Sequence, residues 1–193
     1  SYYIDNANEK NVIRSYDLMK ETVTRLKDQL QVSYYIIGRV KTDEQFSGNP
    51  FEIKINNINP IWYEEVVDFK ILDYDNYQMS LHSGDQIKTF KGQFEKELVN
   101  LDFNILVKRA SIFSKEVVSS ISAINYQIKI HSIDWLIGNF QGAMTVDNPD
   151  YTNILTVSIS DIIPERVTMV LDTLNSVYTE NTVKSKLDLN EKT

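Results

Sequence analysis

The sequence predicts an α+β protein: an antiparallel or mixed sheet packed by an N-terminal helix and a long C-terminal helix, with an inserted β-rich layer. Three features of the 193-residue chain support this prediction. Apolar residues recur at helical spacing near the N-terminus, and they do so again after Pro164. Between these segments apolar and polar residues alternate in short runs, which is typical of half-buried antiparallel strands.

Residues 8–31 predict the first helix. Its apolar positions, three or four residues apart, are Val12, Tyr16, Met19, Val23, Leu26 and Leu30. This repeat places the side chains on one face of a helix. Asn6 and Asn8 are alternative N-caps, because their short polar side chains can accept hydrogen bonds from the first turn.

The middle of the chain predicts short strands. Apolar and polar residues alternate in segments 51–55, 66–72, 77–81, 101–107 and 124–130. The sequence DYDN at 73–76 favours a turn, so residues 66–81 are a candidate β-hairpin.

The last third predicts a short helix at 132–140 with Ser132 as its cap, a strand at 154–160, and a long helix. Pro164 suits the first turn of that helix, and Asp161 is a candidate cap just before it. The apolar stripe of the helix consists of Val167, Val170, Leu171, Leu174, Val177 and Tyr178. After Tyr178 the stripe fades, although the helical composition continues.

These elements predict two domains. Residues 1–32 and 116–193 should form an α+β base domain, in which both helices cover one face of a sheet that includes 154–160. Residues 33–115 should form an inserted β-rich subdomain. The polar start and the polar helical end favour a segment of a longer protein.

Composition narrows the function classes. The net charge of −7 disfavours nucleic-acid binding, because no cluster of Lys and Arg is present to neutralise phosphates. The absence of cysteine excludes thiol catalysis, disulfides and Cys-ligated zinc, and it fits a periplasmic or surface location. The longest apolar runs are far shorter than the roughly 20 residues that span a bilayer.

No residue pattern indicates an enzyme. His82 and His131 are far apart and lack partners at metal-ligand or catalytic spacing. DYDNYQMSLHSGD lacks the glycine and the closing glutamate of a calcium loop. Phosphate-binding glycine loops and nucleophile elbows are absent as well. We therefore predict no catalytic, metal-binding or cofactor-binding residue.

The aromatic residues allow two interpretations. Trp62, Tyr63 and Trp135 are candidate glycan contacts, because an aromatic ring offers its apolar face to a sugar. Most of the aromatic residues should instead fill the core of a β layer. The first interpretation makes the chain a carbohydrate-binding β-module, which is the alternative to the function described next.

Three segments resemble one known family. ILTVSISDIIPERVTMVLDTLNSVYTENTVKSK and NEKNVIRSYDLMKETV are similar to parts of the periplasmic domain of polysaccharide co-polymerases, the chain-length-determinant and exopolysaccharide-transport proteins. VSYYIIGRVKTDEQFSGNPFEIKI (32–55) resembles the Bacteroidetes-type transporters. The resemblance covers 8–55 and 120–190, whereas 56–119 matches only in β character. Its motif residues are Glu9, Ser15, Leu18, Asp161, Pro164, Glu165, Arg166, Leu174, Asn175 and Tyr178.

The resemblance implies a non-catalytic periplasmic scaffold within an inner-membrane protein. Copies would form a ring that regulates chain length or export of a surface polysaccharide, such as an exopolysaccharide, a capsule or an O-antigen. The implied partners are further copies, a polysaccharide polymerase, an outer-membrane export protein and the growing polysaccharide. Some family members carry a cytoplasmic tyrosine autokinase domain, which lies outside this chain.

The same resemblance accounts for the fading stripe, because in this family the last helix continues toward extended helices that contact neighbouring protomers. A periplasmic adaptor of an efflux or secretion system is a third interpretation. Adaptors place a helical hairpin in mid-sequence, whereas here the helical segments lie at the two ends.

Overall fold

The computed structural model describes residues 2–149 and 152–193, and it confirms the predicted α+β class. The chain forms two compact units. Residues 1–27 and 133–193 make the helical unit, and residues 28–132 make the β unit. The division therefore falls at different residues from the predicted 33–115, because segment 116–132 belongs with the strands.

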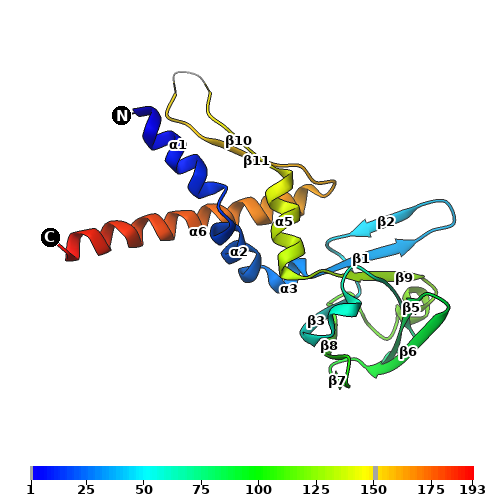
Figure 1. The fold of residues 1–193 in the computed structure, drawn as a ribbon. Coiled ribbons are helices and arrows are strands. Elements are labelled where there is room, and N and C mark those ends of the chain that lie inside the picture. Colours follow the sequence, from blue (N-terminus) through cyan, green and yellow to red (C-terminus); the bar gives the residue numbers. More distant parts are fainter. Residues whose placement is uncertain (1, 150–151) are drawn as a thin grey trace. The chain divides into compact units, whose positions relative to one another are not determined.

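The β unit contains a six-stranded sheet and a three-stranded sheet, in which every strand pair is antiparallel (Figure 1). The order in the larger sheet is β2-β1-β9-β4-β5-β6, and in the smaller sheet β3-β8-β7. The strands are β1 (Val32–Ile37), β2 (Thr42–Gln45), β3 (Phe51–Ile58), β4 (Val66–Ile71), β5 (Asn76–Ser83), β6 (Gln86–Gln93), β7 (Glu97–Val99), β8 (Phe103–Arg109) and β9 (Tyr126–Ile130). Three short helical segments are α3 (Lys27–Leu30), η1 (Pro60–Trp62) and α4 (Val118–Ser122).

One apolar core lies between the two sheets. The predicted alternation is confirmed in β3, β4, β5, β8 and β9, where every second residue is an apolar side chain in the core. Leu101 is the exception: the prediction placed it on the buried face of a strand 101–107, but β8 begins at Phe103 and Leu101 is fully exposed. Aromatic rings stack at the centre of the core: the ring centroids of Phe51 and Phe69 are 3.9 Å apart, and those of Phe69 and Tyr77 are 5.2 Å apart. This stack joins the smaller sheet to the larger one.

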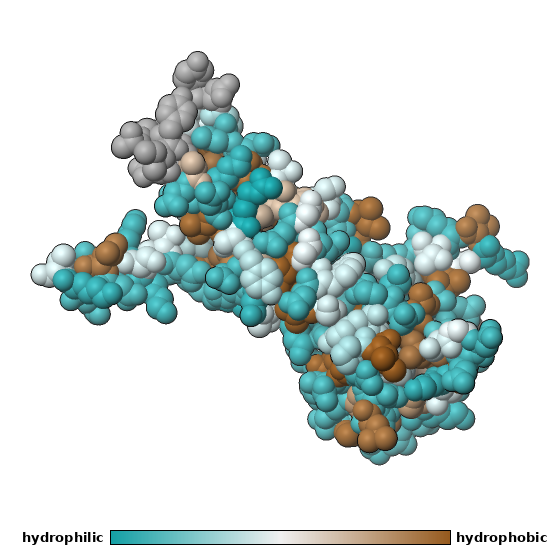
Figure 2. Space-filling view, viewed as in Figure 1, coloured by the Kyte–Doolittle hydropathy of each residue, from teal (hydrophilic) through white to brown (hydrophobic). Residues whose placement is uncertain are grey.

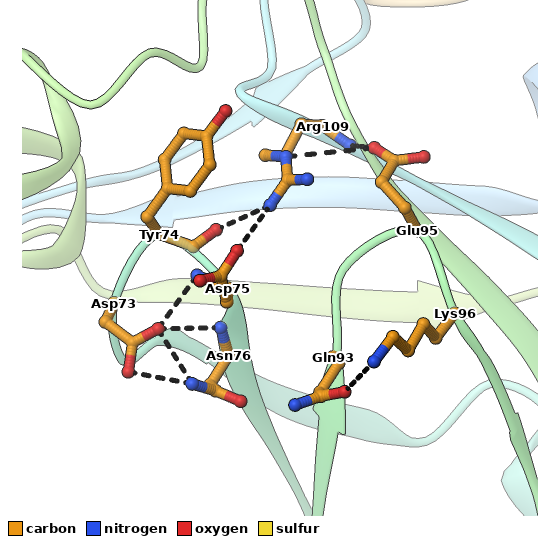
Figure 3. Close-up of polar contacts among 8 residues, drawn as sticks. All are labelled: Asp73, Tyr74, Asp75, Asn76, Gln93, Glu95, Lys96 and Arg109. Atoms are coloured by element: carbon orange, nitrogen blue, oxygen red, sulfur yellow. Dashed lines mark hydrogen bonds and ion pairs between the residues drawn. The ribbon is translucent and has the colours of Figure 1, made fainter.

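The predicted hairpin 66–81 is confirmed as β4 and β5, and polar contacts fix its turn (Figure 3). The Asp73 carboxylate accepts hydrogen bonds from the backbone N–H groups of Asp75 and Asn76 at 2.8 Å. Arg109 donates to the carbonyl oxygen of Tyr74 at 2.8 Å, and its guanidinium lies 4.4 Å from the centre of the Tyr74 ring. The turn is thereby attached to the end of β8.

The helical unit contains α1 (Tyr2–Ile13), α2 (Tyr16–Arg25), α5 (Ile133–Ala143) and α6 (Pro164–Glu191), together with the strands β10 (Met144–Asp147) and β11 (Thr156–Ile159). The single predicted helix 8–31 is wrong in three respects, one of which is an interruption at Leu26 between α2 and α3. The helix begins earlier, so Asn6 and Asn8 lie inside α1 and not at the position of its N-cap. It also breaks before Ser15, which caps α2 by accepting a hydrogen bond from the Leu18 N–H group at 3.3 Å.

The helices pack mainly on one another. α2 contacts both α5 and α6, and α6 also contacts β11. The sheet of this unit consists of β10 and β11 alone, so it is smaller than the sequence predicts. The N-terminal and C-terminal helices therefore share a core that is built chiefly between helices.

The stacked rings of Phe51, Phe69 and Tyr77 should contribute to the stability of the β unit. Phe69→Ala should lower the free energy of unfolding of the β unit by about 3–5 kcal/mol, because it removes a buried ring between two others. Unfolding in urea can be followed by Trp62 fluorescence in a Trp135→Phe background, since the chain has 2 tryptophans.

Ile87→Ala is the matched control. This side chain is 62% exposed, so its truncation should change the unfolding free energy by less than about 0.5 kcal/mol. Equal effects of the two substitutions would contradict the assigned core.

Candidate interaction surface

The ten motif residues of the family resemblance all lie in the helical unit. Ser15 and Leu18 begin α2 as a capping pair, and the Leu18 side chain is buried. Pro164 occupies the first turn of α6, where its missing N–H group costs no helical hydrogen bond. Glu165 follows it in the first turn, where a negative charge suits the helix dipole.

Asp161, just before α6, and Arg166, within it, form a mostly buried ion pair. Two contacts join the groups, from Nε to Oδ2 at 2.7 Å and from the second terminal nitrogen to Oδ1 at 2.8 Å. Asp161 also accepts a hydrogen bond from the Ile163 N–H group at 3.0 Å. Burial opposes the charge on Asp161, but the partners outweigh it and lower the pKa of the carboxyl group.

Asp161 is nevertheless not the N-cap that the sequence predicts. The cap position is Ile163, whose side chain makes no capping hydrogen bond. The Asp161–Arg166 pair instead holds the segment that leads into α6, because it joins a residue before the helix to a residue in its first turns.

Tyr178 brings α1 and α6 together. Burial raises the pKa of its hydroxyl group, and the adjacent carboxylate of Glu9 raises it further. Tyr178 also lines a groove of about 310 Å³. The residues that line this groove are Ile13, Leu155, Val157, Leu171, Asp172, Leu174, Asn175 and Tyr178. Three motif residues, Leu174, Asn175 and Tyr178, therefore meet at one apolar depression.

Besides this groove, the C-terminal part of α6 is a candidate interaction surface. The buried residues of α6 are Val170, Leu174 and Val177, and Asn181, Lys184 and Asp188 would continue that stripe. Since these three are polar and exposed, the core ends near Val177. Figure 1 shows α6 continuing well past α2, and Figure 2 shows apolar residues among polar ones near its end.

The apolar residues of this projecting part are largely exposed. The exposed fractions are 52% for Val183, 59% for Leu187 and 67% for Leu189. Just before them, Arg25 of α2 pairs with Glu180 at 2.6 Å and with Glu21 at 3.0 Å. Asn181 also donates to Glu21 at 3.4 Å, so polar contacts between α2 and α6 follow directly after the last buried residue of α6, Val177.

The structure changes the interpretation of the candidate glycan contacts. Trp62 is 1% exposed and packs edge-on against Phe103 at 5.0 Å, so it is a core residue and offers no ring to a sugar. Tyr63 is half-buried and packs against the same core. Trp135 is 40% exposed and lies in the helical unit. The three residues therefore do not form one aromatic surface within either unit.

His131 has partners that the sequence does not reveal. Its Nε2 atom lies 2.8 Å from the Ser33 hydroxyl, and its Nδ1 atom lies 2.7 Å from a carboxylate oxygen of Glu64. The arrangement matches the roles of a serine–histidine–acid triad. Ser33 is only 8% exposed and His131 only 4%, however, so a substrate cannot reach the hydroxyl group. These contacts favour a structural role.

His82 is exposed and bonds to Asp68, with 2.6 Å between Nε2 and Oδ2. No group of three or more His, Cys, Asp or Glu side chains in residues 2–149 and 152–193 is placed to bind a metal ion. The oxygens of Asp73 in the weak calcium-loop match instead serve its own turn. In the same described part of the chain, no helix is long and apolar enough to cross a membrane.

The sequence was compared with known protein families and with curated proteins. No protein-family model matches the sequence, and no curated protein matches it.

The buried histidine predicts a pH dependence of stability. Burial lowers the pKa of His131 from 6.5, although Glu64 opposes this shift. Below about pH 6.5 the unfolded chain therefore binds a proton that the folded chain does not, so the β unit should lose stability as the pH falls.

Urea unfolding followed by Trp62 fluorescence between about pH 7.5 and 5 measures this loss. A His131→Asn variant is the comparison, because its stability should depend less steeply on pH over this interval. Parallel pH profiles for the two proteins would contradict the role of His131.

Proposed function

We propose that the chain is a non-catalytic scaffold domain that positions copies of an inner-membrane protein on the periplasmic side. Together the copies regulate the chain length or the export of a surface polysaccharide. The full protein would work with a polysaccharide polymerase and an outer-membrane export protein. Such a scaffold acts by holding these partners and the growing polymer close together, which raises their effective concentration.

One observation carries this proposal: α6 continues beyond its core as a helix with exposed apolar side chains. Isolated helical turns are marginal in water without a packing partner. Val183 and Leu187 therefore suit contact with another helix better than permanent solvation. The family resemblance assigns the same position to contacts between protomers.

The carbohydrate-binding alternative loses most of its support with the burial of Trp62. Trp135, which is 40% exposed, and the half-buried Tyr63 are the remaining aromatic candidates from the sequence. A glycan titration that quenches Trp135 fluorescence, with loss of quenching in a Trp135→Phe variant, would favour that alternative.

Inactivation of the gene tests the scaffold proposal. The length distribution or the exported amount of one surface polysaccharide should change, and the wild-type gene should restore it. Electrophoresis of extracted polysaccharide measures the distribution. An unchanged polysaccharide profile in the mutant would contradict the proposal.

The 193-residue chain by itself should sediment as a monomer at micromolar concentrations. Its apolar surfaces are small, and its net charge of −7 repels other copies. Sedimentation velocity measures the mass. A tight oligomer of the chain alone would contradict this expectation.

A further inference from the structure

We propose that copies of this chain associate head to tail, with Val183 and Leu187 of one copy seated in the groove of the next. The groove is the depression beside α6 that Ile13, Leu171 and Tyr178 help to line. This inference rests on the proposed assembly of copies, and it specifies which surfaces meet.

Val183 and Leu187 form a small apolar ridge. They are four residues apart in α6, so they lie one turn apart on the same side of the helix. Both are more than half exposed. A helix presents such a pair of anchors when it docks in an apolar groove.

The groove has the matching chemistry. Its floor consists of aliphatic side chains and the Tyr178 ring, and it joins residues of α1, β11 and α6. Asp172 and Asn175 are the polar residues of its lining, and both are exposed. A depression with an apolar floor and polar groups beside it suits an aliphatic ridge.

Ridge and groove cannot meet within one chain. Both belong to the same helix, and Leu174 and Leu187 are separated by roughly 20 Å along its axis at 1.5 Å per residue. The helix holds them apart, so a contact between ridge and groove joins two molecules. A second copy carries both complementary surfaces.

The positions of ridge and groove around the axis of α6 favour a head-to-tail arrangement over a two-fold dimer. At 100° per residue, Val183 and Leu187 lie roughly 140° and 180° around the helix axis from Tyr178. A two-fold dimer would need ridge and groove on the same side, so that both contacts could form at once. Surfaces on opposite sides produce a head-to-tail contact, which each copy repeats with the next. The copies form a closed ring when the rotation between neighbours is a whole fraction of a full turn.

Charge complementarity supports the same pairing. The groove side carries the acidic residues Glu9 and Asp172, whereas Lys184 and Lys186 flank the ridge. Glu180, also near the ridge, is paired with Arg25. Asp188 and Glu191 share this end of α6, so the attraction is modest. The contact is small, and we expect it to be weak unless a membrane concentrates the copies.

Cysteine cross-linking tests the contact directly, because the chain contains no native cysteine. Leu187→Cys places one thiol on the ridge, and Asn175→Cys places one beside the groove. Both positions are exposed, so neither variant should disturb folding. The two single-cysteine proteins carry tags of different length, are mixed at high concentration, and are oxidised with copper phenanthroline.

The expected product is the mixed dimer of Leu187→Cys with Asn175→Cys, in several-fold excess over either homodimer. A double variant with both substitutions should give a ladder of higher oligomers. Leu101→Cys is the matched collision control, since this residue is fully exposed in the β unit and lies outside both surfaces. It should cross-link to Asn175→Cys only at the background level.

A Leu187→Cys homodimer as the main product would overturn the inference and indicate a symmetric contact. Mixed dimers no more abundant than those with the Leu101→Cys control would overturn it as well. Neither result would remove a polysaccharide phenotype of the gene mutant, so failure of this contact is distinguishable from failure of the proposed function.

Discussion

The packing of α6 against α2 is the interaction on which the helical unit depends. Val170, Leu174 and Val177 supply the buried side of α6, and Met19 and Val23 are among the buried residues of α2. Because polar residues replace the stripe after Val177, the same helix has a docked part and a projecting part. Burial thus fixes the direction of α6, and its remaining turns stay available for contact with another molecule.

The sequence predicted which helix faces are buried better than where the helices begin and end. Met19, Val23, Leu26 and Leu30 are buried as their spacing requires, whereas Val12 and Tyr16 of the same predicted stripe are 44% and 47% exposed. The break before Ser15 was not predicted, because apolar spacing can continue across a short interruption while a capping hydrogen bond leaves little trace in the pattern. The end of the stripe in α6 was visible from composition alone.

Strand faces were predictable in the β unit, but strand partners were not. Alternation shows which side chains of β9 point inward, yet it cannot show that β9 lies between β1 and β4. That pairing moves segment 126–130 from the expected base domain to the β unit. The same limit applies to Trp62 and His131: their residue types fit a binding or a surface role, and only long-range packing reveals that both are buried.

We propose that α6 consists of a docked part and a projecting part that becomes packed against another molecule. Hydrogen exchange along α6 tests it most directly, because amide protection reports local packing. In the isolated chain, residues 167–178 should exchange slowly and residues 181–191 quickly. In the membrane assembly that we propose for the full-length protein, residues 181–191 should become protected. Uniform protection along α6 in the isolated chain, or fast exchange of 181–191 in both states, would contradict this division of α6 into a docked and a projecting part.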